Sequence, residues 1–206
     1  MNLVILGGFL GSGKTTFLLK LAHYLADHAQ TGKMTKVAII ENEIGEVGVD
    51  SSILAAGGLN TRNLFAGCAC CSLRGELIEA IEEIERELDP ETLIVEATGV
   101  AIPANIRRLI KERMGREVCV VVLADGSRWF RMLPVVGELA RGQLEGADLV
   151  IISKIDLLSD EELETALACM RREAPESLVL PFNAMASHPD ETVLARIPEI
   201  WKERKA

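Results

Sequence analysis

The residues with the clearest chemistry lie near the start of the chain, in the segment GGFLGSGKTT over residues 7–16. The segment fits the pattern G-x-x-x-x-G-K-[ST], a phosphate-binding loop (P-loop) whose backbone N–H groups turn toward one anion. Its glycines permit the backbone conformations that such a loop needs. The lysine supplies a positive charge for the β- and γ-phosphates, and the threonine hydroxyl can bind Mg²⁺. We therefore expect a nucleotide site that includes Gly8, Gly11, Ser12, Gly13, Lys14, Thr15 and Thr16.

The sequence on both sides of this loop supports that interpretation. Residues 2–6 are a short apolar run, which is typical of a buried strand, and residues 16–29 carry apolar side chains at helical spacing. A helix that starts after the loop points the positive end of its dipole at the same phosphates. Strand, glycine-rich loop and helix is the context that a P-loop requires.

A second candidate group lies at the end of an apolar strand predicted over residues 92–95. Glu96 follows that strand, where nucleotide hydrolases place the acidic residue that holds Mg²⁺ directly or through water. Gly99, three residues later, leaves room for a γ-phosphate to approach the backbone. The alternative is that Glu96 is an ordinary surface residue after a strand.

A third group follows the strand predicted over residues 148–152. The Asp156 carboxylate can accept hydrogen bonds from N1–H and N2–H₂ of guanine, an edge that adenine lacks. The Lys154 stem can lie over the base plane. Asn183 and Ala184, after the last strand, can form another wall of this pocket.

Three cysteines within four residues form the fourth group. Cys68, Cys70 and Cys71 can direct thiolates at one soft cation such as Zn²⁺, Ni²⁺, Co²⁺ or Cu⁺. A fourth ligand could be water, Glu41 or Glu43, or the same motif of a second subunit. The alternative is packing, because free cysteine behaves as a small hydrophobe. We expect packing for Cys119, in a strand, and for Cys169, in a helix.

Short apolar strands alternate with longer helical patterns along the whole chain, and this alternation predicts the fold class. We expect an α/β fold, a single domain over residues 1–206 with a mostly parallel sheet and helices on both faces. In such sheets ligands bind at the carboxyl ends of the strands, where we expect residues 7–15, 41–50, 96–99, 125–126, 153–156 and 181–184 to lie. The expected strands are 2–6, 36–40, 60–66 (a strand or hairpin arm), 92–95, 118–124, 148–152 and 178–180, and the expected helices are 16–29, 73–88, 103–114, 127–144, 160–172 and 192–202.

Composition indicates the cellular compartment of the protein and excludes some classes of binding partner. The 206 residues are 49% hydrophobic and only 4% aromatic, and the aliphatic content suits a parallel sheet covered by helices. The net charge of −9 argues against broad binding to nucleic acid or to an anionic membrane. We find no apolar run long enough to span a bilayer and no signal peptide, so we expect a cytoplasmic protein with reduced cysteines.

Taken together, these motifs resemble the CobW, HypB and UreG type of metallochaperone GTPase, and the CobW branch most closely. Residues 8–16 are similar to that branch's GFLGxGKTT, 41–50 to its ENExGExGxD switch segment and 67–71 to its GCxCC metal motif. Residues 96–99 match its ExTG, and Asp125 falls on the aspartate of its VVD strand end.

The resemblance implies a GTPase that couples hydrolysis to delivery of a transition metal (Zn²⁺, Co²⁺ or Ni²⁺) or to servicing a metal-dependent or corrinoid enzyme. Its partners would be that client and, with GTP bound, a second copy of the chain. The roles that it implies are phosphate and Mg²⁺ binding for Lys14, Thr15 and Glu96, γ-phosphate sensing for Glu43 or Asp50, metal binding for Cys68, Cys70 and Cys71, and guanine selection for Lys154 and Asp156.

Two departures from the family pattern qualify these expectations. The base motif is usually NKxD, and Ser153 replaces the asparagine that connects the base loop to the P-loop and touches the base. CobW-type proteins also usually carry a C-terminal domain, which we do not find in this sequence. Two alternatives stay open: a nucleotide-dependent interaction switch without metal cargo, and an ATP-using P-loop enzyme that acts on a small molecule.

Overall fold

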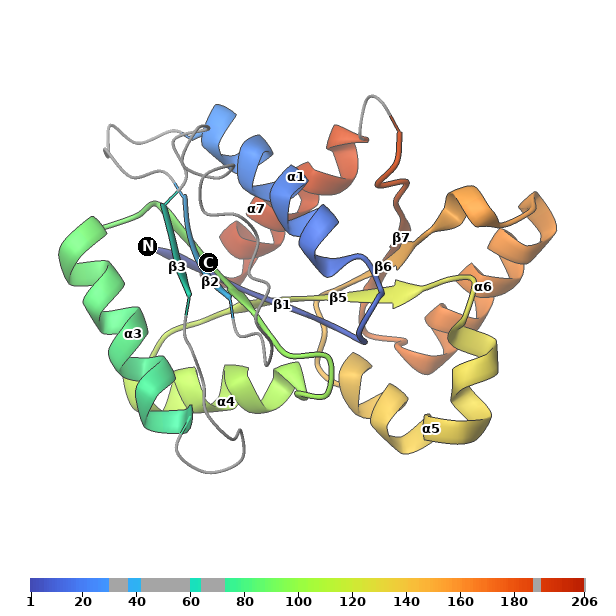
Figure 1. Ribbon diagram of the computed structural model, residues 1–206, viewed down its shortest axis with the longest axis horizontal. Helices are drawn as coiled ribbons and strands as arrows, with labels where there is room; N and C mark the ends of the chain where they lie inside the picture. Colours follow the sequence, from blue (N-terminus) through green and yellow to red (C-terminus); the bar gives the residue numbers. More distant parts are fainter. Residues whose placement is uncertain (30–36, 42–59, 64–72, 187–189, 206) are drawn as a thin grey trace.

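A computed structural model describes residues 1–29, 37–41, 60–63, 73–186 and 190–205 of the chain. A seven-stranded sheet in the order β3-β2-β4-β1-β5-β6-β7 forms its centre (Figure 1). Each pair of neighbouring strands in this sheet is parallel, which confirms the predicted fold class. The strands are β1 (Asn2–Gly8), β2 (Val37–Glu41), β3 (Asn60–Asn63), β4 (Thr92–Glu96), β5 (Cys119–Asp125), β6 (Leu149–Ser153) and β7 (Leu178–Pro181).

Helices cover both faces of the sheet. One face packs against α1 (Lys14–Asp27) and α7 (Glu191–Lys205), which lie together on one side in Figure 1. The other packs against α3 (Leu73–Leu88), α4 (Pro103–Met114), α5 (Trp129–Leu144) and α6 (Asp160–Glu173). A short 3₁₀ turn, η1 (Ile155–Leu157), follows β6.

Alternation of side chains along the strands divides the core into two layers. In β1, Leu3 and Ile5 belong to the layer under α3 to α6, whereas Val4 and Leu6 belong to the layer under α1 and α7. All four side chains are buried, as expected for a central strand covered on both faces. The core therefore holds β1 rigidly, and the P-loop continues directly from it.

Two sequence predictions about elements need correction. Of the segment 60–66 the structure describes residues 60–63, and for these the hairpin alternative is wrong, because β3 pairs parallel to β2, with Asn60 beside Ala38. The helix predicted over 127–144 begins at Trp129 and is interrupted at Val136, whose φ of −126° and ψ of 33° are not helical. Pro134 lies two residues before this break, and proline weakens a helix interior because it has no N–H to donate.

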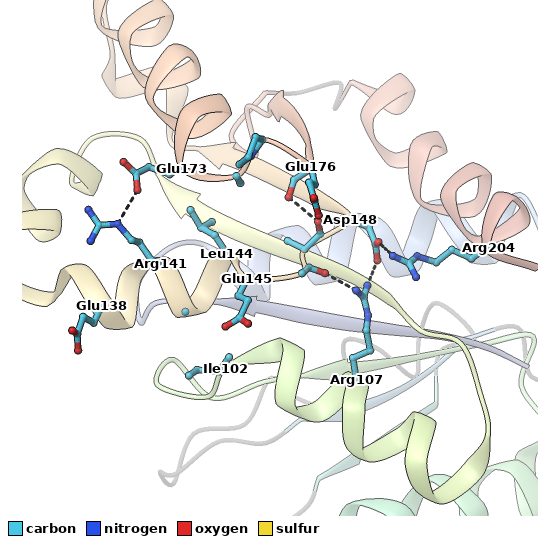
Figure 2. A pocket seen from close by; sticks show the side chains of 16 residues that line it. Ile102, Arg107, Glu138, Arg141, Leu144, Glu145, Asp148, Glu173, Glu176 and Arg204 are labelled. Carbon is cyan, nitrogen blue, oxygen red and sulfur yellow. Dashed lines mark hydrogen bonds and ion pairs between the residues drawn. The ribbon is translucent and has the colours of Figure 1, made fainter.

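The amino-terminal edge of the sheet carries a charged cleft of about 750 Å³ (Figure 2). Asp148, just before β6, points at Arg107 of α4 and Arg204 of α7 and forms ion pairs with both. Arg141 of α5 pairs with Glu173 of α6 in the same cleft. None of the residues expected to bind nucleotide or metal lines this cleft, so its ion pairs serve to join helices and strands.

Within the described residues, we find no helix that is both long and apolar enough to cross a membrane.

Candidate nucleotide site

The P-loop connects β1 to α1 at the carboxyl edge of the sheet. β1 lies between β4 and β5, although β2 and β3 follow it in the chain. The chain therefore leaves β1 in one direction and later returns to its other side. Such a reversal opens a crevice at the carboxyl ends of the strands, which is where α/β folds bind ligands.

Glycines give this loop its shape. Gly8, Gly11 and Gly13 have φ of +130°, +76° and +89°, values that other residues rarely adopt. A Cβ at Gly8 would lie only 2.4 Å from the Leu123 carbonyl oxygen of β5. Backbone conformation therefore favours glycine at all three positions, and close contact with the neighbouring strand also requires it at Gly8.

The interior of the loop is positively polarised. Lys14 begins α1 and is buried, and its Nζ donates hydrogen bonds to the carbonyl oxygens of Gly8 (3.0 Å) and Phe9 (3.2 Å). The first turn of α1 carries no acidic residue that would offset the helix dipole. In the described part of the chain, the buried Ser12 Oγ has no hydrogen-bond partner. Together these groups form an environment suited to phosphate oxygens.

Two acidic residues flank the loop, one on each neighbouring strand. Glu96 ends β4 beside Leu6 of β1, and Asp125 ends β5; both side chains are buried. Thr15 lies half-buried in the first turn of α1 at the same edge. Lys14, Thr15 and Glu96 thus lie at the same edge of the sheet, and their binding of phosphate and Mg²⁺ stays a prediction.

The structure gives a reason for glycine at position 99 that the sequence did not reveal. A Cβ at this position would lie 2.7 Å from the backbone nitrogen of Leu10 in the P-loop. The loop after β4 and the P-loop therefore pack backbone to backbone, and glycine is required for that contact. Its expected role in leaving room for a γ-phosphate stays a prediction.

The loop after β6 is attached to the P-loop through Ser153. Its buried Oγ donates a hydrogen bond to the Ser12 carbonyl oxygen at 2.6 Å, and it also lies 3.2 Å from the Ala124 carbonyl oxygen. In the family pattern NKxD, an asparagine makes this connection, and this chain has Ser153 in its place. The structure shows that the serine makes the connection itself.

Lys154 and Asp156 follow at the same edge. Lys154 has a left-handed φ of +58°, and its Nζ lies 2.8 Å from Asp125 Oδ2. Asp125 also accepts hydrogen bonds from Ser127, through the backbone N and Oγ, so it joins the loops after β5 and β6. Asp156 lies exposed in η1.

Asn183 and Ala184 follow β7, the strand next to β6, after one intervening residue, Phe182. Asn183 Oδ1 accepts hydrogen bonds from the backbone N–H groups of Met185 (2.9 Å) and Ala186 (3.1 Å), which closes a turn. Ala184 packs against the core layer under α1 and α7. The pair lies at the correct edge of the sheet, and a contact with the base stays a prediction.

A family model for the CobW/HypB/UreG nucleotide-binding domain matches residues 2–180. The chain belongs to this family. The zinc chaperone YjiA of Escherichia coli (strain K12) is 34% identical over 217 residues, which cover 94% of this chain and 64% of YjiA. The zinc chaperone CobW of Pseudomonas aeruginosa is 28% identical, over 86% of this chain and 55% of CobW. The chain thus spans less than two thirds of these relatives' length.

Solved structures confirm the CobW/HypB/UreG fold. HypB from Helicobacter pylori in complex with nickel superposes with a TM-score of 0.62 at 19% identity, covering 100% of this chain and 87% of that chain. Zn(II)-bound YjiA GTPase from E. coli superposes with a TM-score of 0.60 at 24% identity, covering 87% of this chain and 56% of YjiA.

Five residues that the family resemblance implicates lie outside the described residues: Glu43, Asp50, Cys68, Cys70 and Cys71. The strands that lead to them end at the site, because Glu41 of β2 lies beside both Glu96 of β4 and Asn63 of β3. Among the described residues we find no cluster of three or more His, Cys, Asp or Glu that could hold a metal ion.

Sequence reasoning missed Gln143 of α5. This fully buried residue accepts a hydrogen bond from the Gly8 backbone N–H and donates one to the Ala101 carbonyl oxygen. The available signal was a polar residue beside the apolar Ala140 and Leu144 on the buried side of the helix.

Proposed function

We propose that this chain is the nucleotide-binding part of a metallochaperone that binds and hydrolyses GTP. The observation that carries this proposal is the P-loop, in which three positive-φ glycines surround a buried Lys14 at the start of α1. Backbone N–H groups, a lysine and a helix N-terminus at one place favour the binding of phosphates.

Mg²⁺ would be held between the nucleotide phosphates and the oxygen donors Thr15 and Glu96. Hydroxyl and carboxylate oxygens are the ligands that this ion prefers, so the residues present fit it. Bound there, Mg²⁺ would neutralise charge that develops on the phosphates during hydrolysis. Lys14 would add its charge to the β- and γ-phosphates, and Glu43 or Asp50 would sense the γ-phosphate.

The loop after β6 supports a preference for guanine. Ser153 holds this loop against the P-loop, so Asp156 lies at a defined distance along the sheet edge from the phosphate site. Its exposed carboxylate is free to accept from the guanine N1–H and N2–H₂ groups, with Lys154 beside the base. In Asp156→Asn the amide NH₂ can donate a hydrogen bond, which the carboxylate cannot. Xanthine has a carbonyl oxygen where guanine has the N2 amino group, so the variant should favour xanthine over guanine.

Nucleotide choice can be measured by competition of GTP, ATP and XTP with a fluorescent guanine nucleotide. We expect GTP to compete at least about tenfold better than ATP, and Asp156→Asn to lose GTP affinity while gaining XTP affinity. Lys14→Ala should abolish GTP hydrolysis. If ATP competes equally well in the parent protein, the site belongs to the alternative class of ATP-using P-loop enzymes.

The cargo that we propose is a transition metal held by Cys68, Cys70 and Cys71, with Zn²⁺ first among Zn²⁺, Co²⁺ and Ni²⁺. Three thiolates suit these cations. The relatives YjiA and CobW are zinc chaperones, which supports the choice of Zn²⁺. GTP binding and hydrolysis would change the affinity of this site and release the metal to a client metalloenzyme or corrinoid protein.

Titration of reduced protein with Co²⁺ and Zn²⁺ tests this coupling, with Mg²⁺ and either GDP or a non-hydrolysable GTP analogue present. We expect cobalt–thiolate absorption whose midpoint differs between the two nucleotides and which Cys70→Ser removes. Cys169→Ser is the matched control, because that cysteine of α6 is buried in the hydrophobic core. Equal metal affinity with both nucleotides would mean that no coupling free energy exists and would favour an interaction switch without cargo.

A nucleotide-dependent homodimer is the partner arrangement that we propose for the GTP-bound protein. Leu10 in the P-loop is 86% exposed and Val100 after β4 is 67% exposed, and both lie where the two loops touch. Apolar side chains exposed next to a ligand site are suited to contact with another protein.

Sedimentation velocity with GDP or the GTP analogue tests the dimer. We expect association with the analogue alone and its loss in Val100→Asp. Val135→Asp is the control, because this residue is also strongly exposed but lies midway along α5. Association that is insensitive to Val100→Asp would contradict this interface.

A further inference from the structure

Gln143 lies in the apolar interior between α5 and the sheet. Its side chain is 0% exposed, and the neighbouring buried positions of the helix are Ala140 and Leu144. An amide in such a place costs free energy unless its polar atoms are hydrogen-bonded. An apolar side chain of similar volume would fill the same space without that requirement.

The two ends of the amide bind two different loops. Oε1 accepts a hydrogen bond from the Gly8 N–H at 3.1 Å, and Nε2 donates one to the Ala101 carbonyl oxygen at 2.5 Å. Gly8 is the first glycine of the P-loop. Ala101 closes the turn after Glu96, since its N–H donates to the Thr98 carbonyl oxygen.

The two loops also touch directly, because a Cβ at Gly99 would lie 2.7 Å from the Leu10 nitrogen. Beside them, the end of β1 touches the start of α4, because a Cβ at Gly7 would lie 2.3 Å from Pro103 Cγ. Glycine is required at both positions. These contacts prevent the loops from moving closer. The hydrogen bonds of Gln143 oppose their separation, so the contacts and the amide together set their spacing.

We propose that Gln143 is a positioning residue that couples the P-loop to the loop after Glu96. Resting on the proposed GTPase function, this inference means that a group 135 residues from Gly8 in the chain holds the phosphate-binding loop and the Mg²⁺-binding strand end in register. Binding of GDP depends mainly on the P-loop and the base loop. Hydrolysis needs both loops in place, so it depends on Gln143 more strongly.

Two variants separate this role from simple packing. Gln143→Met keeps the volume and removes both hydrogen bonds. Gln143→Glu keeps the shape, and only its protonated form can both accept from Gly8 and donate to Ala101. Burial raises the pKa of a carboxyl group, so the neutral acid is accessible at about pH 6.

The expected result is a kcat for GTP hydrolysis that falls about tenfold in Gln143→Met, with GDP affinity changed by less than about threefold. In Gln143→Glu the ratio of its kcat to that of the parent should rise as the pH falls from about 8.5 to about 6, whereas Gln143→Met should show a constant ratio. A constant ratio in both variants, or parental kcat in Gln143→Met, would overturn the proposal.

Amide hydrogen exchange tests the link without relying on activity. Peptides covering residues 3–10 and 97–103 should both exchange faster in Gln143→Met, while a peptide from α6 exchanges as in the parent. Unchanged exchange in the first two peptides would refute the link. Absence of GTP turnover in the parent protein would instead contradict the proposed function, and the exchange result would stand separately.

Discussion

At the scale of single residues, Ser153 shows how one side chain can replace another with different chemistry. Family resemblance predicts an asparagine here, and the serine is shorter and lacks an amide. Its Oγ nevertheless reaches the Ser12 carbonyl oxygen, because β5 and β6 bring the two loops close together and bury the contact. The function of connecting the loops is kept, although the residue type differs.

Ser153→Ala should therefore weaken both GTP and GDP binding by about five- to tenfold while leaving kcat at saturating GTP within about twofold of the parent. The reason is that the lost hydrogen bond supports the ground state and the transition state equally. Fluorescent nucleotide titration and steady-state kinetics measure the two quantities. Ser159→Ala is a control for general loss of stability, because it removes the N-terminal cap of α6. A large fall in kcat with unchanged affinity would contradict the assigned role.

Thiol reactivity gives a second prediction at this scale. Burial raises the pKa of Cys119 to about 12 and also raises the pKa of Cys169. At pH 8 about one Cys119 side chain in ten thousand is then a thiolate, the reactive form. We expect native protein to react with a thiol reagent through Cys68, Cys70 and Cys71 alone, and Zn²⁺ to slow that reaction. Peptide mapping of the modified cysteines checks this, and labelled Cys119 in folded protein would contradict it.

At the scale of secondary-structure elements, local sequence explains where α6 begins better than it explains the break inside α5. Ser159 and Glu162 form a reciprocal capping box at the start of α6, with hydrogen bonds of 2.8 and 3.3 Å between side chain and backbone. Such a cap depends on four consecutive residues and is readable from sequence. The break at Val136 was not predicted from sequence, because the apolar spacing typical of a helix continues across it.

The cap predicts a pH dependence of stability. The hydrogen bond from the Ser159 backbone to the Glu162 carboxylate lowers the pKa of Glu162 below its usual 4.5. A carboxylate with a lowered folded-state pKa stabilises the native state above its unfolded pKa, and this stabilisation is lost as the pH falls through the folded value.

Glu162→Ala should therefore lower the free energy of unfolding more at pH 7 than at about pH 4. Urea denaturation at the two pH values measures the difference. Glu164→Ala is the matched control, because it removes an exposed carboxylate from the same helix without touching the cap. Equal destabilisation by Glu162→Ala at both pH values would contradict the assigned hydrogen bond.

At the scale of the whole molecule, the two edges of the sheet have separate roles. The carboxyl edge gathers the P-loop, Glu96, Asp125 and the base loop, while the amino edge is fastened by Asp148 and its arginines (Figure 2). Asp148 also accepts a hydrogen bond from the Val120 N–H at 2.7 Å, so it joins β5, β6, α4 and α7.

Asp148→Ala should lower the free energy of unfolding by about 3 kcal/mol, because it leaves the largely buried Arg107 guanidinium without its counter-charge. Urea denaturation measures this loss. Nucleotide affinity should stay within about twofold of the parent, since the site lies at the other edge.

Glu199→Ala serves as the control for this variant, because it removes one partner of the exposed Arg196 pair and should cost less than about 0.5 kcal/mol. A loss below about 1 kcal/mol in Asp148→Ala would show that the cluster contributes little.

The sequence by itself determined the class of fold, the P-loop and the family. These follow from local patterns: glycines at positions where φ is positive, apolar runs at strand spacing, and a lysine and threonine at a helix start. Each pattern involves residues close together in the chain, so its physical cause is visible without the fold. Positions such as Glu96 and Lys154 were predictable for the same reason, as Glu96 ends a strand and Lys154 directly follows one.

Only the tertiary structure decided how these parts are joined. The connections of Ser153 to Ser12, of Lys154 to Asp125 and of Gln143 to Gly8 and Ala101 span from 29 to 141 residues of chain. They exist because the strand order β4-β1-β5-β6 places distant segments side by side. The same order explains why Gly99 must be glycine, since nothing in its local sequence shows that Leu10 lies against it. Contacts between distant segments depend on strand order and helix packing, which no short pattern of residues encodes.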